Sequence, residues 1–170
     1  MSDEAHTAEH GASAAPYARS HLRARDRRYL DLYYDDVVAY ARRYGVNPLF
    51  VLAMGIESGF GSRGTYLRTG DAFGLTNGGT DHMTRASSPA QNVKERFDLY
   101  GNQVRGVGDN EDAFVNGLLG MNPRGERVPG WRIYNTDSRA GWIGLIREGV
   151  RQMSSDLARS PPRSPLRSGQ

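Results

Sequence analysis

The chain has 170 residues, 38% of them hydrophobic, and a mean hydropathy of −0.64, which favours one domain with one core and leaves part of the chain outside it. It has no cysteine, which excludes disulfides, thiol catalysis and cysteine-based zinc or iron–sulfur sites. The net charge of +3 and the pI of about 9.4 come almost entirely from arginine. They suit an anionic polymer such as nucleic acid or bacterial cell wall, although an arginine-rich codon usage explains them equally well.

The two ends of the chain differ in composition from its middle. Residues 1–26 are rich in Ala, Ser, His and charge without a sustained period, which predicts a disordered N-terminal arm. Residues 158–170 form a Pro/Ser/Arg tail that is also predicted to be disordered, so the folded domain is expected over 27–157. The first residues are acidic and lack an apolar stretch, so no secretory signal peptide is expected. The longest apolar run, 49–56, is too short to span a bilayer, so no membrane insertion is expected.

Two helices are predicted at the start of this domain. Apolar residues recur every three or four positions over 29–44, as on one face of a helix, and Gly45 supplies a C-terminal stop. Asn47 is a suitable N-cap and Pro48 suits the first helical position, so a second helix is predicted over about 48–58. This segment is apolar nearly all round, which is typical of a buried central helix.

The rest of the domain is predicted to be loop followed by helices. Glycine-rich residues 59–92 predict a loop with at most one short hairpin, and residues 94–100 a short strand or extended segment. The acidic run 109–112 opens a further helix, where carboxylates favour the helix dipole. The spacing of a calcium loop is absent there, so no metal site is expected. A last helix is predicted from Asp137 or Ser138. Its core stripe consists of Trp142, Ile146, Val150, Met153 and Leu157.

Glu57 combines charge with an apolar setting. It follows the apolar stretch 48–56 and precedes the glycine-rich loop that opens with Ser58 and Gly59. A carboxylate in such a place is costly unless it has a partner or a function, and low dielectric is expected to raise its pKa. A carboxylic acid that keeps its proton near neutral pH is what glycosidic-bond cleavage requires of its general acid.

Other motifs in the chain carry less weight. Residues 59–64 match G-x-G-x-x-G, but the segment before them is predicted to be a helix and no helix follows, which argues against a dinucleotide site. No nucleophile elbow, P-loop or His-Glu-x-x-His pattern is present. The arginine run at 19–28 lacks interleaved aromatic residues and a recognised motif, so no nucleic-acid partner is expected.

Four short elements resemble those of the bacterial glucosaminidases of glycoside hydrolase family 73, which belong to the lysozyme-like group. The elements are 53–61 (AMGIESGFG), which resembles the family's ALESGWG; 71–75 (DAFGL), which resembles NLFGIK; 96–100 (RFDLY), which resembles FRxY; and 134–137 (YNTD), which resembles YATD. The resemblance covers about residues 30–155, and Asp71 stands where the family usually has asparagine.

The resemblance implies a mainly α, lysozyme-like domain whose helices and glycine-rich loop or short hairpin lobe form a cleft. It implies an endo-β-N-acetylglucosaminidase that cleaves the glycan strand of peptidoglycan after N-acetylglucosamine, without a cofactor. Glu57 maps onto the catalytic acid and Tyr134 onto the active-site tyrosine, whose hydroxyl can orient an N-acetyl group or a water. Phe73 is expected to offer a flat face to a sugar ring, and Gly74 to let backbone approach the glycan. The implied substrate-binding residues are Phe60, Phe73, Gly74, Tyr100 and Trp131.

The second catalytic group stays open at this point. Asp71, Asp81 and Glu95 are the candidate carboxylates, and a substrate-assisted route, in which the acetamido group of the sugar attacks, needs none of them. The alternative activity is a muramidase or lytic transglycosylase of the same fold, with Glu57 as both acid and base. The alternative class is a non-catalytic wall-binding or structural protein of a secretion or phage machine.

The expected setting of the activity is the bacterial periplasm. With no signal peptide expected, the protein is predicted to be made in the cytoplasm and to reach the cell wall, that of a target cell, by a non-classical route. Its small size and its predicted disordered ends resemble those of type VI secretion glycoside hydrolase effectors, and a phage-type lysin fits as well. Such an antibacterial toxin implies a cognate immunity protein that occludes the cleft.

Overall fold

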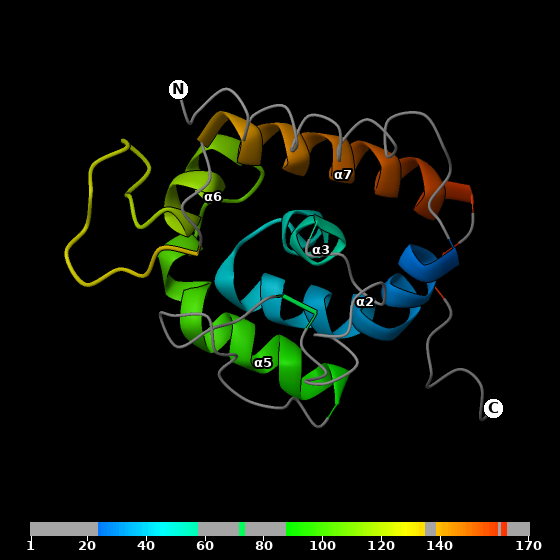
Figure 1. The fold of residues 1–170 in the computed structure, drawn as a ribbon. Coiled ribbons are helices and arrows are strands. Elements are labelled where there is room, and N and C mark those ends of the chain that lie inside the picture. Colours follow the sequence, from blue (N-terminus) through cyan, green and yellow to red (C-terminus); the bar gives the residue numbers. More distant parts are fainter. Residues whose placement is uncertain (1–23, 58–71, 74–87, 135–138, 160, 163–170) are drawn as a thin grey trace, which may run out of the picture.

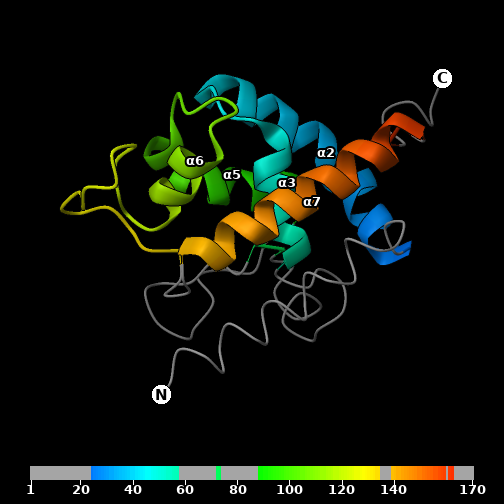
Figure 2. The same ribbon diagram turned by 90° about the horizontal axis from the view of Figure 1, so that it is seen from above.

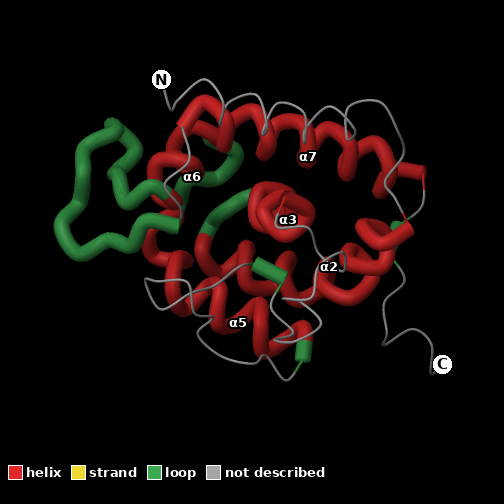
Figure 3. Tube along the Cα trace, viewed as in Figure 1, coloured by secondary structure: helices red, strands yellow, loops and turns green. Residues whose placement is uncertain are grey.

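The computed structural model describes residues 24–57, 72–73, 88–134, 139–159 and 161–162, and these form a mainly helical domain without a β-strand (Figures 1 and 3). Its helices are α2 (Ala24–Tyr44), α3 (Pro48–Glu57), α5 (Pro89–Tyr100), the 3₁₀ helix η1 (Gly101–Val104), α6 (Glu111–Leu118) and α7 (Arg139–Arg159). The predicted α class is thus confirmed for the described residues. Most of the predicted arm, tail and hairpin lobe lies outside them, although α2 begins at Ala24, inside the predicted arm.

The central helix of the domain is α3. Figure 1 shows it end-on between α7 on one side and α2 on the other, and Figure 2 shows α7 crossing over it. All its side chains from Phe50 to Met54 are buried. Asn47 caps the helix, because its Oδ1 accepts a hydrogen bond from the backbone N–H of Leu49 at 2.9 Å, and Pro48 is the first helical residue. The predicted buried helix with an Asn-Pro start is confirmed.

One face of α2 packs against this central helix. The buried residues of that face are Tyr29, Leu30, Tyr33, Val37 and Ala41. Gly45 follows the helix with a φ of +66°, in the left-handed region, and the amide of Val46 donates to the carbonyl of Ala41 at 3.0 Å. This is a Schellman closure, for which glycine is the favoured residue, so the predicted helix stop is confirmed.

Residues 94–100 are helical, so the strand or extended segment predicted there is wrong. They form the last part of α5, whose N-cap Ser88 accepts a hydrogen bond from the amide of Gln91 at 3.1 Å, with Pro89 at the first helical position. The buried face of α5 consists of Asn92, Val93, Arg96, Phe97 and Tyr100. Because two of these five are strongly polar, the apolar period that reveals an amphipathic helix is interrupted.

The start of α6 agrees with the sequence prediction. Asn110 caps the helix through its side-chain oxygen, and Glu111 and Asp112 lie in the first turn. These two carboxylates form ion pairs with Arg147 and Arg139 of α7, so the acidic run ties the two helices together. Within the described part of the chain, no group of three acidic, histidine or cysteine side chains is placed to hold a metal ion.

The last helix, α7, carries the predicted core stripe. Its buried residues include Trp142, Ile146 and Met153, while Val150 and Leu157 are partly buried against the core. The helix begins at Arg139, next to residues 135–138, which are outside the described part. A Cβ atom at Gly149 would come within 3.0 Å of the Cβ of Ala53, so this glycine lets α7 lie close to α3. None of the described helices combines the length and the apolar character needed to cross a bilayer.

Candidate functional site

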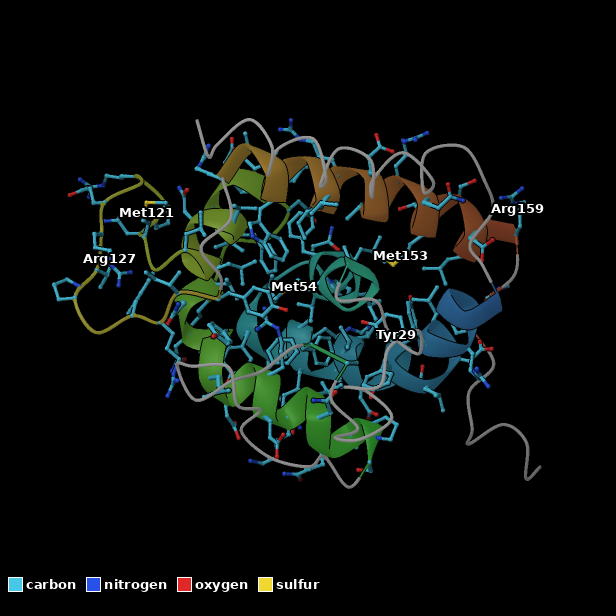
Figure 4. All side chains as sticks on the ribbon, viewed as in Figure 1. Tyr29, Met54, Met121, Arg127, Met153 and Arg159 are labelled. Atoms are coloured by element: carbon cyan, nitrogen blue, oxygen red, sulfur yellow. The ribbon has the colours of Figure 1, made fainter. Side chains whose placement is uncertain are left out.

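Glu57 is the last residue of α3, as the sequence predicts, and its side chain is outside the described part of the structure. Met54, one helical turn earlier, is fully buried and lies at the centre of the domain (Figure 4). The last turn of α3 therefore begins within the core.

Tyr134 joins two segments that are far apart in the sequence. Its hydroxyl donates a short hydrogen bond to the backbone carbonyl of Phe73, and its backbone N–H donates to the carbonyl of Leu118 at 2.7 Å. Its ring makes edge-to-face contacts with Tyr100 on one side, at 5.5 Å between ring centroids, and with Trp142 on the other, at 5.4 Å. These contacts fix both the backbone and the ring of Tyr134, so the position of its hydroxyl is determined by the fold.

Asn92 holds the same segment from the other side. Its Oδ1, fully buried, accepts hydrogen bonds from the backbone N–H of Ala72 at 2.7 Å and from the hydroxyl of Tyr33 at 3.4 Å. Residues 72–73 are thus tied to α5 through Asn92 and to the end of the 119–134 loop through Tyr134. Residues 72–73 are the part of the DAFGL element (71–75) that the structure describes.

Arg96 is the least expected residue of this region, because its side chain is fully buried. Its Nη2 donates to the sulfur of Met54 at 3.2 Å, and its guanidinium lies over the rings of Phe97 and Tyr100, at 5.2 and 5.8 Å from their centroids. Its Nε and Nη1 are buried and have no hydrogen-bond partner among the described residues. Burial lowers the pKa of Arg96 to about 10, so the group still carries its charge at neutral pH.

Gln103 of η1 fixes the loop that carries Tyr134. Its Nε2 donates to the carbonyls of Gly117 and Arg132, at 2.8 and 2.9 Å, and its Oε1 accepts from the amide of Arg132 at 2.7 Å. Farther out, the side chain of Arg127 donates to the carbonyl of Gly120 at 2.9 Å. Figure 4 labels this arginine on the loop that projects beside α6. The inner end of the loop is therefore held firmly where it approaches Tyr134.

The remaining predicted site residues fall into two groups. Phe73, expected to offer a flat face to a sugar, is instead fully buried with its ring edge-on to Tyr33. Tyr100 is also buried, which raises the pKa of its phenol above the usual value. Trp131 is half-buried in the loop, and Glu95 is half-buried on α5, where it accepts a hydrogen bond from Gln91. The others are outside the described residues: Phe60, Gly74, Asp71 and Asp81.

The predicted cleft has no described walls. Its borders would come from residues 58–71 and 74–87, which are outside the described part of the chain. Among the described residues, an open depression of about 450 Å³ lies between α6, the first residue of α7 and the projecting loop. Its lining includes Asn116, Arg124 and Arg139, and none of the predicted site residues.

We predict that Tyr134→Phe lowers the free energy of unfolding by about 1–2 kcal/mol, because the Phe73 carbonyl loses its hydrogen-bond donor while the ring contacts remain. Urea denaturation measures the loss. Tyr40→Phe is the matched control, since Tyr40 stacks on Phe97 at 5.4 Å and that contact survives the change. Equal stability of the two variants would contradict the anchoring role of the Tyr134 hydroxyl.

These contacts define a mainly helical domain in which a buried arginine of α5 contacts the buried helix α3, and an internal tyrosine holds the 72–73 segment. No protein-family model, no curated protein and no solved structure matches this chain.

Proposed function

We propose that the protein is a peptidoglycan hydrolase of lysozyme-like fold, an endo-β-N-acetylglucosaminidase with Glu57 as its general acid. The supporting observation is a continuous line of contacts through all four elements that resemble family 73. It runs from Met54 to Arg96, from Arg96 to Tyr100, from Tyr100 to Tyr134, and from Tyr134 to Phe73. Four chance similarities in a sequence have no reason to meet in space, whereas the parts of one site do.

Glu57 is assigned the acid step. It would donate its proton to the glycosidic oxygen as the bond to the sugar breaks. The end of a buried helix suits this role, because the packing of α3 holds the backbone that carries Glu57. The partner in the second step is either a carboxylate, Asp71 or Asp81, or the acetamido group of the substrate itself. Glu95 fits this step less well, since it is engaged with Gln91 on α5.

Tyr134 is assigned a positioning role towards the substrate. Its hydroxyl hydrogen is used in the bond to the Phe73 carbonyl, so towards a substrate the oxygen would serve as an acceptor, for an N-acetyl N–H or a water. With the Phe73 ring in the core, the contribution of this segment to sugar binding would come from its backbone. The Phe73 ring then has no direct contact with the sugar, while the segment that contains it still takes part in sugar binding.

Digestion of purified peptidoglycan by the wild-type protein, followed by mass spectrometry, tests the proposal. Fragments that end in reducing N-acetylglucosamine are the expected products. Fragments that end in reducing or anhydro-muramic acid would instead assign a muramidase or a lytic transglycosylase of the same fold. No release of fragments would overturn the enzymatic proposal and favour a wall-binding or structural role.

The proposal includes an antibacterial setting, with delivery to the periplasm of a target cell and an immunity protein that occludes the site. It rests on the resemblance to secreted glycoside hydrolase effectors. Expression directed to the periplasm is expected to lyse cells, while cytoplasmic expression is harmless. Equal harmlessness of the two would contradict this setting without contradicting the glycosidase activity.

A further inference from the structure

The depression between α6, the first residue of α7 and the projecting loop is lined mainly by polar side chains. Its volume of about 450 Å³ lies within the range of small-ligand sites, about 300–1,000 Å³. Three lining residues carry a charge: Arg124 on the loop, Arg139 at the start of α7 and Asp112 on α6. Two positive charges and one negative charge leave an excess of one positive charge. The depression therefore favours a ligand with one negative charge.

Arg139 is held in place by the protein itself. Its Nε donates to Oδ1 of Asn116 at 2.7 Å, and its Nη2 lies 3.4 Å from Oδ1 of Asp112. Asn116 is only 3% exposed, so the acceptor for Nε belongs to the packed structure. A guanidinium has five N–H groups, and Nη1 has no partner among the described residues. The side chain of Arg139, 43% exposed, therefore offers further donors to a ligand in the depression that it lines.

Arg124 stands on a turn that is also fixed. Its backbone N–H donates to Oδ1 of Asn122 at 3.0 Å, and the backbone N–H of Asn122 donates to the carbonyl of Glu126 at 2.9 Å. The guanidinium of Arg124 is exposed, and its one ion-pair partner in the described part of the chain is Glu126, at 3.9 Å. A surface pair at that distance contributes little, so Arg124 can turn to another anion at little cost. Two guanidinium groups thus approach the depression from separate elements.

We propose that this depression binds a carboxylate of the peptide that peptidoglycan carries on its muramic acid residues. The inference rests on the proposed function for the source of the carboxylate. The planar guanidinium of Arg139 matches a carboxylate through charge-assisted N–H···O bonds, and Arg124 adds a second positive charge from the loop. A phosphate with two negative charges fits less well, because Asp112 would repel it. The sugar rings of the substrate are neutral, so the carboxylates of its peptides are the groups that this depression would select.

The depression adjoins the region assigned to the glycan. Asn116 lies on α6 two residues before Leu118, whose carbonyl accepts the backbone N–H of Tyr134 at 2.7 Å. Arg139 lies on α7 three residues before Trp142, whose ring contacts that of Tyr134 at 5.4 Å between centroids. Both helices that border the depression therefore also contact Tyr134. Binding of the peptide branch beside this tyrosine would help to hold the glycan in one register.

Titration of the full chain with muramyl dipeptide (N-acetylmuramyl-L-alanyl-D-isoglutamine) tests the site without any need for glycan cleavage. This probe carries one carboxylate, and its terminal amide, which carries none, is the matched ligand control. The dipeptide is expected to bind more tightly than its amide. Arg139→Gln is expected to weaken its binding at least about 10-fold, because glutamine has neither the charge nor the fork. Arg124→Gln is expected to weaken it about 2–3-fold, since that guanidinium is more exposed.

Arg151→Gln is the matched control variant. Arg151 is an exposed arginine of the same helix, bonded to Glu148 and outside the depression, so this variant is expected to bind like the wild type. Arg139→Lys keeps the charge but loses the fork, and is expected to fall between the wild type and Arg139→Gln. A cooperative melt shows whether each variant is folded. If Arg139→Gln does not fold, Arg139→Lys and Arg124→Gln carry the test.

Three outcomes of the titration would overturn the proposal. The first is equal binding of the dipeptide and its amide. The second is equal binding of the dipeptide by Arg139→Gln and Arg151→Gln. The third is binding of acetate as tight as that of the dipeptide, which would reject the assignment to the peptide of the cell wall.

Glycan cleavage links the depression to the proposed function. The wild type is expected to cleave soluble glycan fragments that carry their peptides with a lower KM than fragments from which an amidase has removed them. The ratio of the two KM values is expected to shrink about 10-fold in Arg139→Gln and to persist in Arg151→Gln. An unchanged ratio in Arg139→Gln would contradict the proposal. Successful titration without glycan cleavage would reject the proposed function alone, and glycan cleavage with a failed titration would reject the carboxylate site alone.

Discussion

Glu57→Gln is expected to reduce the release of glycan fragments from purified peptidoglycan by at least about 100-fold. Glutamine has nearly the same shape as glutamic acid and fits the same helix end, but it has no proton that it can transfer to a leaving oxygen. The change therefore removes the chemistry while the chain still folds. Mass spectrometry of released fragments over time measures the rate for both proteins.

The matched control for this prediction is Glu95→Gln. Glu95 is a half-buried carboxylate on α5 that accepts a hydrogen bond from Gln91, and glutamine can still accept that bond. The control is expected to keep the wild-type rate. Circular dichroism and a cooperative melt show whether each variant is folded. Near-normal activity of a folded Glu57→Gln would exclude Glu57 as the general acid.

Gly55→Ala is expected to lower the free energy of unfolding by about 1–3 kcal/mol. A Cβ atom at this position would lie 2.2 Å from the hydroxyl oxygen of Tyr29, which is fully buried and donates to the carbonyl of Leu52 at 3.0 Å. The ring has to move in a packed core, at a cost of about 1–3 kcal/mol, and the loss of its hydrogen bond adds about 1 kcal/mol. The better helix propensity of alanine offsets about 1 kcal/mol of this loss.

The comparison with Gly144→Ala isolates the steric part of that effect. Gly144 lies within α7, is exposed, and a Cβ atom there meets nothing within 4 Å. The same substitution in this second helix is expected to raise stability by about 0.5–1 kcal/mol. Urea denaturation of the two variants gives both values. If Gly55→Ala is as stable as Gly144→Ala, the close contact between Tyr29 and α3 is not what fixes the position of this helix.

The sequence was a good guide to helices whose ends carry capping residues. Asn47, Asn110 and Gly45 all act in the structure as their chemistry predicts. The same kind of signal marks α5, where Ser88 and Pro89 form an N-cap and a first helical residue. The sequence pattern nevertheless does not predict a helix behind this cap, because the buried face of α5 is partly polar and its apolar residues follow no clear helical period.

The candidate site could be predicted only in part, for a related reason. Glu57 stands out in the sequence because charge follows an apolar run, and Tyr134 because it belongs to a short motif. Asn92 and Arg96 do not stand out, since a polar residue in an isolated sequence segment reads as exposed. Only the packing of α5 against α2, together with the contacts of Asn92 with Ala72 and of Arg96 with Met54, reveals that both are buried. The Phe73 ring illustrates the opposite case, because an aromatic residue expected at a surface became part of the core.

The anchoring of residues 72–73 by Asn92 and Tyr134 has a consequence for how the chain can vary. Residues 72–73 are therefore a fixed point within the connection from α3 to α5, held from α5 on one side and from the 119–134 loop on the other. A change in the number of residues on one side of this point leaves the point itself, and the anchors of the other side, in place. Sequence changes before and after it can thus accumulate independently around the same helical frame.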